Sequence, residues 1–136
     1  MSRWVCPGCD REFGKAHQSH VCVPGCTVDE CFAGRLWQRV IYAAIEAHLR
    51  SLGELHVDAV RVGVFLKHER KLAEVRPKVK WLSLDLFLPR ELDHPRIARR
   101  LKVSADRTMH TIKLVSAEDV DAEVQAWLTE AYLAAG

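Results

Sequence analysis

The chain has 136 residues, 49% of them apolar, and a formal net charge of +2. This length accommodates one compact domain with a short appendage, and the apolar content is enough to fill a core without disulfides. Charged residues interrupt every apolar run before it reaches membrane-spanning length, and no targeting segment is visible, so the sequence excludes a membrane protein and predicts a cytoplasmic location.

The charge is unevenly distributed along the chain. Residues 1–59 carry a net charge of −1, residues 60–113 carry +8, and residues 114–136 carry −5. A basic segment followed by an acidic one indicates either pairing within the molecule or an anionic partner.

The first segment in chain order contains most of the cysteine. All five cysteines lie between Cys6 and Cys31, which in a reducing compartment indicates metal binding rather than disulfides. A C-x2-C turn brings two thiolates to one cation, and four nitrogen or sulfur ligands form a closed structural site. The spacing therefore predicts a zinc-binding head over residues 1–25, with Zn²⁺ held by Cys6, Cys9, His20 and Cys22.

Other ligand sets fit the same segment. His17 together with His20 would give two cysteine and two histidine ligands, and Cys26 together with Cys22 would give a second cysteine pair. A third interpretation is that these residues bind nothing. Cys26 and Cys31 are also compatible with a redox pair, although the helical apolar spacing around Cys31 favours a buried thiol.

The second segment, residues 26–136, has the pattern of an α+β domain. A capping box at residues 27–30 precedes a short turn, and apolar spacing of three and four residues then predicts a helix over 35–52, with Leu36, Trp37 and Val40 among its apolar positions. Alternating patterns predict strands at 60–67, 71–75 and 80–88, a hairpin of 97–103 with 108–115, and a last helix capped by Ser116. The predicted fold is a zinc knuckle followed by a small antiparallel sheet flanked by two helices.

These motifs resemble a bacterial family described only as domain of unknown function fifty-six fifty-five. The resemblance covers nearly the whole chain and is carried by the segments Trp4–Cys9, Arg11–Phe13, Gln18–Cys22, Phe32–Gly34, Pro77–Lys78, Leu82–Leu88, Asp119–Asp121, Trp127–Leu128 and Ala131–Tyr132. It implies zinc at the four positions named above, and Cys26 and Cys31 are extra thiols relative to its pattern. The second segment is also loosely similar to MmcQ/YjbR-like domains, which implies a modest expectation of nucleic-acid binding.

Basic residues concentrate around the predicted strands and turns of the second segment. On a common face they would track a phosphate backbone, whereas the ordinary interpretation is a solvated surface that protects sheet edges. Arg99 and Arg100 are adjacent in a strand and should point to opposite faces. The candidate nucleic-acid contacts are Lys78, Lys80, Arg96, Arg99, Arg100, Lys102 and Arg107.

Catalytic motifs are lacking. The histidines are scattered, no nucleophile has a recognisable motif, and no Gly-rich phosphate loop is present. His110, on an apolar strand face, has the pattern of a hydrogen-bonded core histidine. Three hypotheses follow: a zinc-headed nucleic-acid-binding accessory protein, a protein-interaction module in which the zinc head and the acidic last helix dock a partner, or an enzyme acting on an anionic small molecule. The expected partner is nucleic acid or an acidic protein surface.

Overall fold

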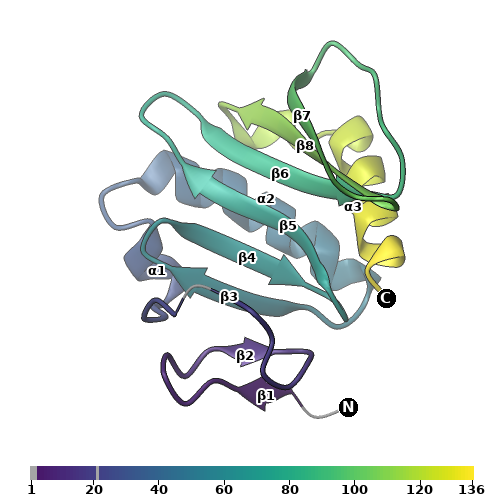
Figure 1. Ribbon diagram of the computed structural model, residues 1–136. Coiled ribbons are helices and arrows are strands. Elements are labelled where there is room, and N and C mark those ends of the chain that lie inside the picture. Colours follow the sequence, from purple (N-terminus) through teal and green to yellow (C-terminus); the bar gives the residue numbers. More distant parts are fainter. Residues whose placement is uncertain (1–2, 21) are drawn as a thin grey trace.

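The computed structural model describes residues 3–20 and 22–136 and contains two sheets (Figure 1). A two-stranded sheet near the N-terminus consists of β1 (Trp4–Val5) and β2 (Glu12–Phe13). The second sheet has six antiparallel strands in the order β3-β4-β5-β6-β8-β7. Its strands are β3 (His56–Val60), β4 (Gly63–Lys67), β5 (Lys71–Pro77), β6 (Leu82–Leu88), β7 (Ile97–Ser104) and β8 (Arg107–Leu114).

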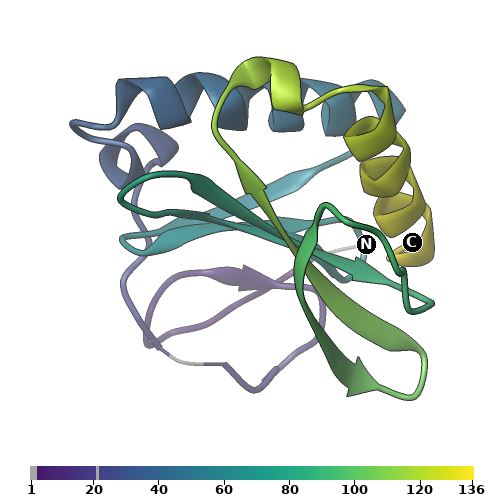
Figure 2. The same cartoon turned by 90° about the horizontal axis from the view of Figure 1, so that it is seen from above.

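The large sheet has helices on one face and the N-terminal unit on the other (Figure 2). The helical elements are α1 (Val28–Cys31), α2 (Leu36–Leu52), the 3-10 turn η1 (Ala117–Asp119) and α3 (Ala122–Ala134). We call the side of the sheet that α2 and α3 cover the helix face, and the opposite side the open face. The predicted α+β class and the antiparallel sheet are confirmed. Within the described part of the chain, every helix is too short or too polar to cross a bilayer.

The core lies between the helix face and the two long helices. Leu82, Leu84, Leu86 and Leu88 alternate along β6 and are all fully buried. Ile41, Ile45 and Leu49 face them from α2, and α3 contributes Val124, Trp127, Leu128, Ala131 and Tyr132. Burial of these apolar surfaces is the main force that holds the helices on the sheet.

Helix α2 has a second apolar stripe that no part of the described chain covers. Leu36 is 78% exposed and Val40 is 52% exposed, although both belong to the apolar spacing that predicted the helix. At its other end, α2 closely approaches α3, since a Cβ added to Gly53 would lie 2.6 Å from the Tyr132 hydroxyl. The helix thus packs through one side only, and its apolar content exceeds what the core uses.

The predicted strand at 60–67 is confirmed over residues 63–67, but its start is wrong, because the chain turns at Arg61 and Val62 into the β3–β4 hairpin. Val60 pairs with Gly63 and Ala59 pairs with Val64, so Val60 and Val64 lie on opposite faces of the sheet. Val64 enters the core, whereas Val60 is buried beneath the N-terminal unit. A two-residue turn between valines preserves an alternating pattern, which is why periodicity did not reveal it.

The last helix begins later than predicted. Ser116 forms a capping box with Asp119, but this box caps η1 rather than the long helix. The α3 helix begins after Asp121, whose carboxylate accepts a hydrogen bond from the Val124 N–H at 3.1 Å. Asp121 is therefore the N-cap, as its side-chain chemistry favours.

His110 lies in the core on the helix face of β8. Its Nδ1 is 3.0 Å from the Thr108 carbonyl, and its Nε2 accepts a hydrogen bond from the Leu92 N–H at 2.8 Å. Both bonds require the neutral ring with the proton on Nδ1. Burial lowers the pKa of His110, with smaller contributions from Arg100 and Arg90. The predicted core histidine is thus what the structure contains.

This arrangement makes folding stability depend on pH. Because the pKa of His110 is lower in the folded chain than its unfolded value of about 6.5, the unfolded state binds the proton first on acidification. The contribution of neutral His110 to the free energy of unfolding is complete above about pH 6.5. It is lost as the pH falls below that value, at up to about 1.4 kcal/mol per pH unit. Urea unfolding at pH 7 and pH 5 should show a larger loss in the wild type than in His110→Gln. Equal losses would contradict this assignment.

Candidate metal centre and adjoining groove

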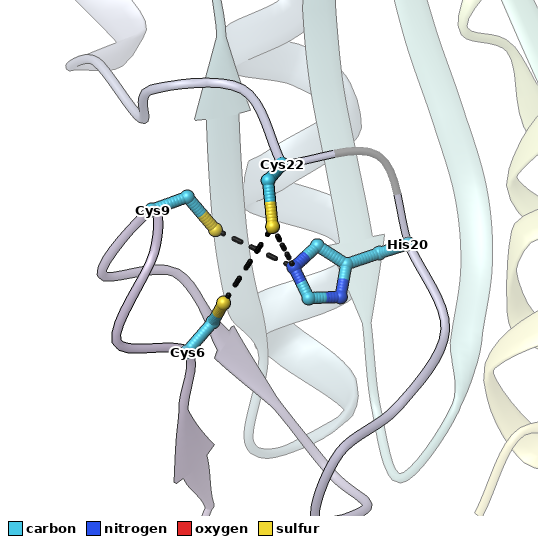
Figure 3. A group of neighbouring side chains, drawn as sticks. All are labelled: Cys6, Cys9, His20 and Cys22. Carbon is cyan, nitrogen blue, oxygen red and sulfur yellow. Dashed lines mark hydrogen bonds between the residues drawn. The ribbon is translucent and has the colours of Figure 1, made fainter.

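Four side chains of the N-terminal unit converge on one point. Cys6 follows β1, Cys9 closes the turn before β2, and His20 and Cys22 come from the segment after β2 (Figure 3). The turn is held by the Asp10 N–H, which donates to the Cys6 carbonyl at 2.7 Å, and by the Cys6 N–H, which donates to the Arg11 carbonyl at 2.9 Å. The donor atoms of the four side chains all lie within 4.8 Å of one another. They can therefore share one metal ion.

The spacing of these atoms matches four-coordinate geometry. Bonds of about 2.3 Å to sulfur and about 2.0 Å to nitrogen at tetrahedral angles separate two sulfurs by roughly 3.8 Å and a sulfur from a nitrogen by roughly 3.5 Å. The Sγ atoms of Cys6 and Cys22 are 3.7 Å apart. His20 Nε2 lies 3.5 Å from Cys9 Sγ and 3.3 Å from Cys22 Sγ. Little movement is needed to close the four ligands around an ion.

The surroundings of the cluster prepare its ligands. His20 Nδ1 lies 2.6 Å from the Gln18 carbonyl, so it donates its proton there and leaves Nε2 free for the metal. Burial alone would raise the pKa of the Cys6 thiol, but the N–H groups of Gly8 and Cys9 and the neighbouring thiols lower it to about 6. Phe13 is buried and stacks on the His20 ring at a centroid distance of 4.0 Å. A thiolate and an oriented imidazole are the forms that bind metal.

The alternative ligands lie elsewhere. The His17 ring packs against Trp4 at a centroid distance of 5.1 Å, and neither His17 nor Cys26 belongs to the four-residue cluster. The Cys26 N–H donates to the Ala59 carbonyl at 2.9 Å, where the chain passes from the head to the large sheet. Cys31 is buried in the main core, as its spacing predicted.

The head is attached to the open face by a buried ionic cluster. Arg11 donates to both carboxylate oxygens of Asp58, with Nε–Oδ1 and Nη2–Oδ2 distances of 3.0 Å. Lys67 donates to Asp58 Oδ2 at 2.9 Å and to the Glu12 carbonyl at 3.1 Å. The Arg11 guanidinium also lies over the rings of Phe13 and Phe65, at 5.3 and 5.4 Å. Burial raises the pKa of Asp58, but the two cations lower it overall, so the carboxylate is ionised at neutral pH.

A groove of about 770 Å³ runs between the head and the open face. Eight Lys or Arg side chains of the described chain line it, against two Glu, which gives the lining a formal charge of +6. Three of these cations come from the head and five from the sheet: Arg3, Arg11, Lys15, Lys67, Arg70, Lys71, Arg76 and Arg107.

Part of this charge is neutralised within the protein. Glu74 is buried in the groove, where it forms ion pairs with Lys71 and, at 3.1 Å, with Arg76. In the sheet it is paired with Asp85 of β6. Lys71 and Arg107 also lie over the ring of Phe87, at 5.2 and 4.7 Å. Asp58, which contacts both Arg11 and Lys67, neutralises one further positive charge where the head meets the sheet. The remaining charge is strongly positive, which favours an anionic ligand.

The basic residues proposed from the sequence do not share one face. Arg99 corresponds to Thr111 on the open face, whereas Arg100 and Lys102 correspond to His110 and Thr108 on the helix face. Lys78 and Lys80 lie at the β5–β6 turn, and Arg96 is paired with Asp121 and Glu123. Of the seven, only Arg107 lines the groove. The other cations that line the groove were not predicted from the sequence, because they come together only where the head docks on the sheet.

Comparison with known proteins identifies one family. The model of the family described as "Domain of unknown function (DUF5655)" matches residues 28–135, which is most of the chain. The match begins after the Cys/His cluster, so the zinc head that the resemblance implied lies outside it, and the MmcQ/YjbR similarity gains no support. No curated protein and no solved structure matches the chain. The chain belongs to the DUF5655 family.

Proposed function

We propose that this member of the DUF5655 family is a zinc-binding protein that holds a nucleic-acid strand in the groove between its head and its sheet. In this proposal residues 1–25 form the head and residues 26–136 form the α+β domain. The observation that carries the proposal is the excess of cationic side chains along the groove. Phosphate contacts by Lys and Arg supply most of the affinity of sequence-independent nucleic-acid binding.

Zinc is the ion that fits the cluster best. Three thiolates and one imidazole are soft ligands in tetrahedral positions, which favours zinc over calcium or magnesium. Four protein ligands leave no open position for substrate, so the ion has a structural role. The segment is too short to form a core of its own, and metal binding supplies the free energy that folds it.

The groove suits a flexible single strand better than a rigid duplex. It is lined from two sides, by the head and by the sheet, so a strand placed in it contacts cations on both walls. Phe65 lines the floor, and together with Lys71 it offers an apolar and cationic surface to a base. Stacking of this kind is tolerant of sequence, and we expect little base preference.

Fluorescence anisotropy with short single-stranded DNA and RNA at increasing salt tests the proposal. Lys15→Gln with Arg70→Gln removes two exposed groove cations. Affinity should fall, and the slope of log K against log salt should flatten by roughly 0.7 for each phosphate that the protein no longer neutralises. The matched control is Lys80→Gln with Lys102→Gln, which removes two exposed cations outside the groove and should leave the slope unchanged. No binding to DNA or RNA at low salt would rule out the proposed function.

A second candidate function is an interaction module for another protein. The exposed apolar side chains Leu36, Trp37 and Val40 of α2 favour it, together with Val79 at 93% exposure in the β5–β6 turn. The Gln38 side chain donates to the carbonyls of Lys78 and Trp81, which joins this turn to the start of α2. Exposed apolar patches mark protein contacts, and the neighbouring Lys78 and Lys80 suit an acidic partner surface.

A further inference from the structure

A second, smaller pocket lies beside the groove, where β6 and α3 end. Its volume is about 310 Å³, within the range of roughly 300–1,000 Å³ that small-molecule sites have. Arg70 and Arg107 line both this pocket and the groove, so the two cavities adjoin. A strand whose phosphates lie along the groove can therefore place one of its bases in the pocket.

The walls of this pocket are mostly apolar. They come from the end of β6, the proline that follows it and the last turns of α3: Phe87, Leu88, Pro89, Ala131, Ala134 and Ala135. The Arg70 N–H donates to the Ala135 carbonyl at 3.0 Å and fixes the β4–β5 turn against the helix end. The Arg107 guanidinium lies over the Phe87 ring at 4.7 Å and donates to the Lys71 carbonyl, so it adds a flat cationic surface. Unstacked bases bind against apolar and guanidinium surfaces of this kind.

A carboxylate stands beside these walls. Asp106, in the turn between β7 and β8, is exposed and lines the pocket together with Arg70 and Arg107. Its Oδ1 accepts a hydrogen bond from the Ser104 hydroxyl at 2.9 Å, and this bond lowers the pKa of Asp106, so the carboxylate is ionised at neutral pH. Among residues 3–20 and 22–136, no cation forms an ion pair with it. Asp106 therefore keeps acceptor capacity for a ligand.

We infer that this pocket binds one base of the strand and selects a base that carries an exocyclic amino group. An ionised carboxylate accepts hydrogen bonds and cannot donate them, so Asp106 can pair with the amino group of cytosine, adenine or guanine. Uracil and thymine place a carbonyl oxygen where cytosine has its amino group, and two acceptors repel each other. The inference rests on the proposed function, since it identifies the one position at which a strand held by its phosphates is read.

Oligo(C) and oligo(U) of equal length test this inference, because their bases have the same ring size and differ at the edge that Asp106 would contact. Fluorescence anisotropy should give about tenfold tighter binding of oligo(C), which is the discrimination that one good base contact supplies. The salt dependence of both strands should be the same, because they carry the same phosphates. Equal affinities would overturn the inference and leave the proposed function standing. If neither strand binds at low salt, the proposed function fails, and the inference fails with it.

Asp106→Asn should remove the preference for oligo(C) while metal content stays unchanged, because an asparagine amide can donate to the uracil carbonyl. Asp93→Asn is the matched control, since it removes an exposed carboxylate that lines neither cavity and should keep the preference. Both variants raise the net charge equally, so the ratio of the two affinities is the readout. Ala134→Leu, which narrows the pocket without changing its charge, should also reduce this ratio. A wild-type ratio in Asp106→Asn would overturn the inference.

Discussion

Cys9→Ser should produce a protein that carries no zinc and has an unfolded head. A serine hydroxyl does not replace a thiolate as a zinc ligand, and three remaining ligands leave the site open. Structural zinc supplies about 10–16 kcal/mol of apparent binding free energy near neutral pH, far more than a segment of this size obtains from burial. Elemental analysis of the protein purified under reducing conditions should show one zinc per chain in the wild type and none in the variant.

The rest of the fold should survive this loss. The main core contains none of the four cluster residues, and its burial is supplied by the sheet, α2 and α3. Amide resonances of residues 28–135 should therefore keep their dispersion, while those of the head collapse. Cys26→Ser is the matched control, because it removes a thiol outside the cluster and should retain the ion. Zinc retained at wild-type affinity in Cys9→Ser would refute the ligand assignment.

The convergence of the four Cys and His side chains could be predicted from the sequence because its determinants are local. Cys6 and Cys22 are separated by 16 positions, and the C-x2-C turn has few conformations that leave its thiolates free. The helix at 36–52 was predictable for the same reason, since its spacing of buried residues repeats every turn. Where the residues of a site or a helix are close together along the chain, their spacing in the sequence is enough to predict it.

The groove could not be predicted, because its residues meet only through the tertiary fold. Arg11 and Asp58 are separated by 47 positions, and no periodicity connects them. The face of the sheet to which a strand residue points also depends on turns. The two-residue turn after Val60 places Val60 and Val64 on opposite faces, whereas a continuous strand would place them on the same face. The charge distribution identified a basic segment correctly but could not separate Lys71, which lines the groove, from Lys102, which faces away.

Asp58→Asn should detach the head from the sheet without releasing the metal. The substitution leaves Arg11 and Lys67 buried beside a neutral amide, and breaking a buried pair on one side typically costs about 3 kcal/mol or more. We expect a lower melting temperature, wild-type zinc content and loss of oligonucleotide binding, because one wall of the groove is no longer held in place. Calorimetry, elemental analysis and anisotropy on the same preparation measure all three.

Asp29→Asn is the control for this substitution. It also removes a carboxylate paired with an arginine, but that side chain is 86% exposed and its ion pair should contribute little to stability. Cys9→Ser and Asp58→Asn then separate two roles, since the first removes the metal and the second removes only the docking. If Asp58→Asn binds oligonucleotides as the wild type does, the strand lies outside the groove.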